Sequence, residues 1–142
     1  MSKKGKNTEG GKIDLIKLFS TSLNLNIDAQ SVADFDNTIP LPLRQLYAIK
    51  KAYDSVKPNN YLFRHQDRLT LEDKLDLSKD TLTFLTENQG NWYCFIKKNV
   101  KKPIIYRNNW ENTEGVSDSL SDFLTSYALQ ELAFEMEDRA AN

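Results

Sequence analysis

Hydrophobic positions in the first part of the chain recur at the three- and four-residue steps that line one face of a helix. The first run predicts a helix over residues 13–23. A second run predicts a helix that begins at Pro42 and ends before the turn sequence at residues 58–60. Pro42 suits the first helical turn, because the N–H that proline lacks would have no partner there. An Asp- and Asn-rich connection, residues 24–39, joins the two helices.

The spacing of apolar residues changes after the second helix. Residues 61–63 are a candidate short strand, and residues 69–77 are predicted to be a loop with one helical turn. Residues 81–86 and 92–97 are β-branched and aromatic runs that flank a short connection containing Gly90. This arrangement indicates a β-hairpin.

The hairpin connection, residues 87–91, is predicted to be a tight turn. Gly90 can adopt a positive φ without steric cost, and the side chain of Asn88 can cap the turn. In the strand that follows, one face carries Trp92, Cys94 and Ile96, and the other carries Tyr93 and Phe95. Both faces are therefore apolar. One face must meet the helices, and we expect Trp92 to be largely buried there; the other is covered by further chain or left as an aromatic surface that marks a partner site.

The C-terminal part predicts a third strand, a loop and a long helix. The strand covers residues 103–107 and the loop residues 108–115. Ser119 and Asp122 resemble a capping box, so we expect the helix to start near Ser119. The residues expected to pack on the sheet are Leu120, Phe123, Leu124, Tyr127 and Leu132. The residues expected to stay in water are Glu131, Glu135, Glu137 and Asp138.

This order of elements predicts an α+β fold, in which an antiparallel or mixed β-sheet is flanked by N-terminal helices and a C-terminal helix. A chain of 142 residues suits one domain, which we place at residues 13–142. Residues 1–12 are rich in Lys, Gly and polar residues, so we expect a disordered or loosely attached tail.

Charge is distributed unevenly along the chain. Residues 1–102 hold 17 Lys and Arg against 12 Asp and Glu, a net charge of +5, whereas residues 103–142 hold 2 against 8, a net charge of −6. The acidic segment is either a solvated helix face or an anionic patch that faces a basic partner.

The single cysteine, Cys94, has no partner for an internal disulfide and lies in an apolar run, so it is predicted to be a buried free thiol. A reducing compartment suits such a chain. No run approaches the roughly 18 apolar residues of a membrane span, and the N-terminus lacks the apolar stretch of a secretory signal. We therefore expect a cytoplasmic protein that does not bind membranes.

Few residues point to catalysis. His65 is the only histidine, which excludes a metal site built from several histidines, and we expect it to be partly exposed at a strand end. Glu87 stands at a strand end and could act as a general acid, but it lacks a partner carboxylate nearby. Turn carboxylates commonly bond neighbouring backbone N–H groups instead. We assign no catalytic residue, metal or cofactor, and a small hydrolase-type enzyme using Glu87 or His65 is the less favoured alternative.

A basic and aromatic stretch is a candidate nucleic-acid site. Its members are Lys97, Lys98, Lys101 and Lys102 with Tyr106 and Trp110. The acidic C-terminal segment offsets these charges, and no RNA- or DNA-binding motif accompanies them. We therefore expect a solvated hairpin loop and no nucleic-acid partner.

Several pieces of the sequence, taken in order, resemble the SUKH superfamily, which includes many bacterial toxin-immunity proteins and relatives of the yeast cell-wall assembly regulators. The resemblance spans roughly residues 40–126. Its pieces are Leu41-Pro42 with Leu46-Tyr47, the turn Phe84-Leu85-Thr86-Glu87-Asn88-Gln89-Gly90 before Trp92-Tyr93, Pro103-Ile104-Ile105-Tyr106, Trp110, and Ser119-Leu120-Ser121-Asp122-Phe123-Leu124. The Glu-Asn-Gln-Gly turn is the most specific of them.

The resemblance implies an α+β domain that acts by binding and without catalysis. For bacterial members it implies a cytoplasmic protein that occludes a cognate toxin, often a nuclease. Our leading hypothesis is an immunity protein that binds a toxin domain directly, and the alternative is a regulatory scaffold with another partner. No oligomeric state is predicted.

The contact residues that we expect are Glu87, Asn88, Gln89, Trp110, Glu111 and Glu114. Trp110 lies in a polar loop and can serve as an interface anchor. Alternatively, its ring folds back onto the core of its own chain. The neighbouring carboxylates would accelerate capture of a basic toxin.

Overall fold

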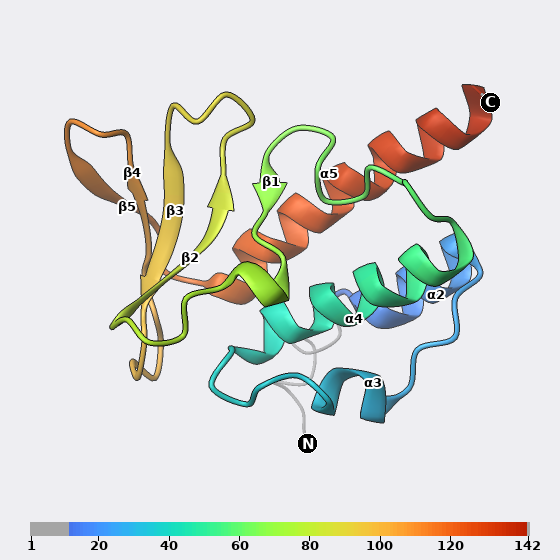
Figure 1. The fold of residues 1–142 in the computed structure, drawn as a ribbon, viewed down its shortest axis with the longest axis horizontal. Helices are drawn as coiled ribbons and strands as arrows, with labels where there is room; N and C mark the ends of the chain where they lie inside the picture. The colour runs from blue at the N-terminus through green and yellow to red at the C-terminus, as the bar shows by residue number, and fades with distance from the viewer. Residues whose placement is uncertain (1–11, 142) are drawn as a thin grey trace, which may run out of the picture.

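The computed structural model describes residues 12–141, so the predicted N-terminal tail lies almost wholly outside the described residues. Helices and one β-sheet share the chain, which confirms the α+β class (Figure 1). The helical elements are α2 (Leu15–Leu23), α3 (Ala29–Ala33), α4 (Leu41–Val56), the 3-10 turn η1 (Glu72–Lys74) and α5 (Leu120–Ala141). The strands are β1 (Arg68–Leu69), β2 (Thr81–Thr86), β3 (Tyr93–Lys97), β4 (Ile105–Asn108) and β5 (Thr113–Ser117).

The sheet is an antiparallel meander in the order β1-β2-β3-β4-β5, so β1 and β5 are its edges. Figure 1 shows the sheet at one end of the molecule and the helices gathered beside it, with α5 running from the end of β5 past the sheet to α2 and α4. The helices cover one face of the sheet. The buried strand residues on that face include Leu82, Phe84, Leu85, Cys94, Ile96 and Ile105.

A bulge in β2 adds one residue to this buried face. Thr83 pairs with Phe95 and Leu85 pairs with Cys94, so Phe84 is the extra residue in β2. Phe84 and Leu85 are consecutive and both buried, and the ring of Phe84 meets Phe123 of α5 edge-on at 6.0 Å. The bulge therefore fixes the sheet against α5.

Two helix starts follow the predicted signals at Pro42 and Ser119, and the start of α2 is capped by Asp14, which the sequence analysis did not single out. The carboxylate of Asp14 accepts a hydrogen bond from the N–H of Lys17 at 3.1 Å and caps α2. Helix α4 begins at Leu41 after Pro40, with Pro42 in its first turn. The hydroxyl of Ser119 accepts the N–H of Asp122 at 3.1 Å just before α5. The predicted bounds of these three helices are thus close to those observed.

Four local predictions were wrong or incomplete. The connection 24–39 contains the short helix α3, which the sequence analysis missed. Residues 61–63 form a turn and no strand, because Phe63 has a φ of +66° and buries its ring. Strand β1 was missed in the segment before η1, and β5 begins inside the predicted loop 108–115 and occupies its last three residues.

Glu131 and Glu135 were expected in water, and this was wrong: their exposed fractions are 1% and 0%. The two residues are one helical turn apart on the inner side of α5. The carboxylate of Glu131 accepts the backbone N–H groups of His65 at 3.0 Å and of Gln66 at 3.2 Å. Charged side chains are buried in this way only when they are paired or hydrogen-bonded.

Glu135 is the centre of a buried polar network. It accepts the hydroxyl of Tyr53, lies 2.8 Å from Nε2 of His65 and forms an ion pair of 3.4 Å with Lys57. Burial raises the pKa of Glu135, but the hydrogen bonds from Tyr53, His65 and Lys57 together outweigh burial, and the net shift is downward. These contacts tie α5 to α4 and to the segment that follows it.

Candidate partner-binding surface

The turn between β2 and β3 is ordered by its own residues. Gly90 has a φ of +79°, and its N–H donates to the carbonyl of Glu87 at 2.8 Å. The carboxylate of Glu87 accepts the N–H of Asn91 at 2.9 Å. The turn is thus capped by Glu87 and not by the side chain of Asn88 as predicted. The carbonyl of Asn88 instead accepts a hydrogen bond from Arg68 at 2.6 Å.

Trp110 lies in the β4–β5 loop and reaches across to this turn. Its indole N–H donates to the carbonyl of Gly90 at 2.8 Å, and its ring lies 5.1 Å from that of Tyr93. Its backbone N–H donates to the side chain of Asn108 at 2.7 Å. The residue has a φ of +76° and is 69% exposed. Its ring therefore neither folds into the core nor moves freely.

The sheet face away from the helices carries a row of aromatic side chains. The rings of Tyr93 and Phe95 are 6.0 Å apart, and Phe95 stacks on Tyr106 of the next strand at 5.4 Å. The ammonium of Lys97 lies 5.3 Å from the centre of the Tyr106 ring. We call this row, together with Trp110, the aromatic face.

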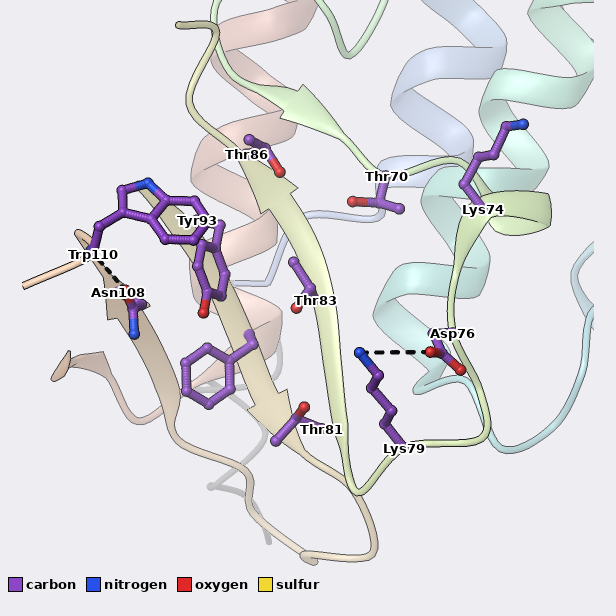
Figure 2. A pocket seen from close by; sticks show the side chains of 11 residues that line it. Thr70, Lys74, Asp76, Lys79, Thr81, Thr83, Thr86, Tyr93, Asn108 and Trp110 are labelled. Atoms are coloured by element: carbon purple, nitrogen blue, oxygen red, sulfur yellow. Dashed lines mark hydrogen bonds and ion pairs between the residues drawn. The ribbon is translucent and has the colours of Figure 1, made fainter. Parts of the chain in front are cut away.

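A groove of about 670 Å³ runs along this part of the sheet (Figure 2). Figure 2 shows Thr81, Thr83 and Thr86 of β2 between the aromatic side chains and the segment 70–79, which forms the other wall. Lys79 and Asp76 of that wall form an ion pair of 3.8 Å. The threonine stripe was missed from sequence, although the alternation in Thr81-Leu82-Thr83 indicates one polar face.

The structure brings most of the predicted contact residues to one end of the sheet. The turn residues Glu87, Asn88 and Gln89 lie beside Trp110, because Trp110 bonds the same turn, and Glu111 follows Trp110 in the exposed loop. Glu114 is different. It pairs with Arg107 on the opposite face, where their side chains are 2.7 Å apart.

A second cleft of about 530 Å³ lies on the helix side of the sheet, between β3, β4 and α5. Trp92 lines it and is half-buried, so the prediction that Trp92 is largely buried was too strong. The guanidinium of Arg107 lies 5.7 Å from the centre of its ring. Asp67 also lines the cleft, and burial, with a smaller contribution from the charge of Glu87, raises its pKa.

The residues weighed for catalysis are engaged in structural contacts. Cys94 is buried as predicted, and burial raises the pKa of its thiol to about 11, far from that of a reactive thiolate. His65 is bonded to Glu135 and lies 6.0 Å from the ring of Phe134, and Glu87 caps its own turn. Among residues 12–141, no group of three or more His, Cys, Asp or Glu side chains could hold a metal ion.

Comparisons of the chain with protein-family models, with curated proteins and with solved structures give no match. None of the helices in the described part of the chain has both the length and the apolar character needed to cross a bilayer.

Proposed function

We propose that this protein is a binding module that neutralises a partner protein by direct association, and that the partner is the toxin domain of a bacterial toxin–immunity pair. The single observation that carries the binding proposal is Trp110. Within the part of the chain that the structure describes, it is the most exposed of the large hydrophobic residues, and it is nevertheless held in one orientation by its bond to Gly90.

A fixed and exposed indole is what an interface anchor requires. Tryptophan is enriched among residues that contribute most to binding, because it buries a large area with few rotatable bonds. The bond to Gly90 orders the ring before any partner arrives, so little further entropy is lost on association. The aromatic face beside it supplies apolar area for the remainder of the contact.

The choice of a toxin domain as partner follows from the resemblance to SUKH immunity proteins. The most specific piece of that resemblance is the turn within residues 84–93, and Trp110 is bonded to this same turn. Exposed carboxylates nearby, including Glu111, would accelerate the encounter with a basic toxin and would make its rate dependent on salt.

The test is a calorimetric titration of this protein against the toxin domain encoded by the neighbouring reading frame. Wild type is expected to bind, and Trp110→Ala is expected to weaken binding by about 2 kcal/mol, as truncation of a central anchor does. Tyr61→Ala is the matched control, because Tyr61 is also a large exposed aromatic residue but lies in the segment after α4. Failure of wild type to bind would refute the toxin assignment, and equal affinity of the two variants would remove Trp110 from the site.

A further inference from the structure

The outer edge of β5 is an open hydrogen-bonding edge of the sheet. Among residues 12–141, β5 is the last strand of the meander and pairs with β4 on one side only. Its sequence, Thr-Glu-Gly-Val-Ser, contains neither proline nor lysine, the residues with which natural edge strands commonly prevent pairing.

The register shows which backbone groups of β5 are directed outward. Asn109 donates to the carbonyl of Asn112 at 3.2 Å, so these two residues form a hydrogen-bonded pair at the end of the hairpin. Hydrogen-bonded and non-hydrogen-bonded pairs alternate along an antiparallel ladder. Glu114 therefore bonds to Arg107 of β4, whereas the N–H and C=O groups of Thr113 and Gly115 point away from β4.

Gly115 also leaves a space for a side chain from an added strand. It pairs with Tyr106 on the aromatic face. A Cβ at position 115 would lie 3.5 Å from Cγ2 of Ile104, whose side chain is 43% exposed. A residue opposite Gly115 on an added strand could therefore cover Ile104 without meeting a β5 side chain.

The exposed charges of β5 and of the segments that flank it in sequence are negative, whereas the ammonium of Lys97 in β3 lies 5.3 Å from the ring of Tyr106, the residue that pairs with Gly115. No Lys or Arg occurs between residues 108 and 138, and the acids Glu111, Glu114, Asp118 and Asp122 are all exposed. The cation nearest in sequence, Arg107, is paired with Glu114. A second copy of this chain would bring the same acids to the interface, so charge complementarity favours a basic segment from a different protein.

We infer that β5 is the docking edge for an extended, basic segment of the partner, which adds a sixth strand to the sheet. The inference rests on the proposed function and names the recognition element of that partner. Backbone hydrogen bonds at Thr113 and Gly115 hold the segment, and its Lys or Arg side chains face the acids at residues 111–122. This is the strand-addition mode of peptide recognition, in which the main chain supplies affinity and the side chains supply specificity.

The test compares Gly115→Pro with Gly115→Ala against the toxin domain of the neighbouring reading frame. Proline removes the outward N–H, whereas alanine keeps it and meets Ile104 at an ordinary contact distance. Gly115→Pro is expected to weaken binding about tenfold, as loss of one interface hydrogen bond does. Gly115→Ala is expected to weaken binding by no more than about threefold, because it keeps the N–H donor and adds only a methyl group to the space over Ile104. The additional loss in Gly115→Pro then measures the donor.

Hydrogen exchange of wild type supplies a second measurement that does not depend on the proline variant folding. The amides of Thr113 and Gly115 should become protected when the toxin domain binds. Normal binding by a folded Gly115→Pro variant, or unchanged exchange at both amides in the complex, overturns the inference while leaving the proposed function intact.

Two further outcomes would also overturn the inference. If wild type does not bind the toxin domain, the proposed function fails and the docking edge fails with it. If wild type is a dimer that Gly115→Pro dissociates, and binding of the toxin domain is unaffected, the edge belongs to a second copy of the chain.

Discussion

The indole N–H of Trp110 donates a 2.8 Å hydrogen bond to the carbonyl of Gly90 and thereby joins the β4–β5 loop to the β2–β3 turn. The strands β2 and β5 that these connections bound are not neighbours in the sheet. The bond places an exposed aromatic ring beside the β2–β3 turn. The carboxylate of Glu87 stabilises this turn by accepting the N–H of Asn91. Stability and binding can be separated at this position, because the ring is exposed while its backbone is strained.

Trp110→Gly is expected to leave the free energy of unfolding within about 1 kcal/mol of wild type, because glycine adopts positive φ without the cost that other residues incur. The variant loses the indole bond but also loses the backbone strain at a φ of +76°. Chemical denaturation measures the change. A loss of several kcal/mol would show that the ring supports the fold and is not available mainly as an anchor.

Trp92→Ala is expected to cost about 2–3 kcal/mol, less than the 3–5 kcal/mol that a fully buried aromatic ring would cost. The reduction follows from the half-buried position of Trp92 in the cleft beside Arg107. Phe84→Ala is the comparison, because Phe84 is fully buried and should show the larger loss. Chemical denaturation measures both losses of stability. Equal denaturation midpoints for the two variants would contradict the prediction that Phe84→Ala is the less stable one.

Glu135→Gln is expected to destabilise the protein by about 3 kcal/mol near neutral pH, because it disrupts a buried ionic network. The folded-state pKa of Glu135 is lowered, so its carboxylate contributes stability above the unfolded-state pKa, and this contribution is lost as the pH falls through the folded-state pKa. The difference from wild type should therefore shrink in acid.

Urea denaturation of both proteins near neutral pH and at about pH 3 measures this change. The pKa of Glu131 is raised, chiefly by burial, so protonation of Glu131 favours the folded state in acid in both proteins and cancels in the comparison. Glu137→Gln is the control, since Glu137 is exposed on the same helix. A difference between Glu135→Gln and wild type that is independent of pH would contradict the account.

Alanine at the two glycines among residues 12–141 should have unequal effects. Gly90 has a φ of +79° with open space around it, so Gly90→Ala is expected to cost about 1 kcal/mol through backbone strain alone. Gly115 has no such backbone conformation, and Gly115→Ala should change stability by less than about 0.5 kcal/mol. Thermal unfolding of both variants measures the two losses of stability. A larger loss in Gly115→Ala than in Gly90→Ala would contradict the prediction.

The sequence was sufficient to predict the elements that carry a strong periodic signal. Helices α2, α4 and α5 and the β2–β3 hairpin show apolar spacing or β-branched runs together with start or turn signals. Strand β5 lacks such a signal, because Thr-Glu-Gly-Val-Ser is largely polar and its extended form depends on pairing with β4. Strand β1 has two residues and depends in the same way on β2.

The buried acids of α5 show a different limit. Glu131 and Glu135 continue the helical spacing of Leu124 and Ala128, so periodicity alone places them on the inner face. Their charge led to the prediction that both side chains are exposed to water, since glutamate is rarely buried without partners. Those partners come from residues 53–66, far away in the sequence, and only the folded chain brings them together.

The predicted contact residues divide for a similar reason. Trp110 and the turn at residues 87–89 meet through a hydrogen bond that no spacing rule reveals. Glu114 was grouped with Glu111 because they are close in sequence, but the alternation of β5 sends Glu114 to the face of Arg107. The prediction of which contact residues share a face failed because the strand register was unknown, and not because of the residue types.

The central proposal is that this chain inactivates a toxin domain by direct binding at the Trp110 end of the sheet. The most direct measurement is the activity of the purified toxin domain of the neighbouring reading frame, titrated with this protein. The account predicts that one equivalent of wild type abolishes the activity, whereas folded Trp110→Gly needs about tenfold or more excess, in keeping with the loss of a central anchor. Full toxin activity in the presence of excess wild type, or equal potency of Trp110→Gly, would contradict it.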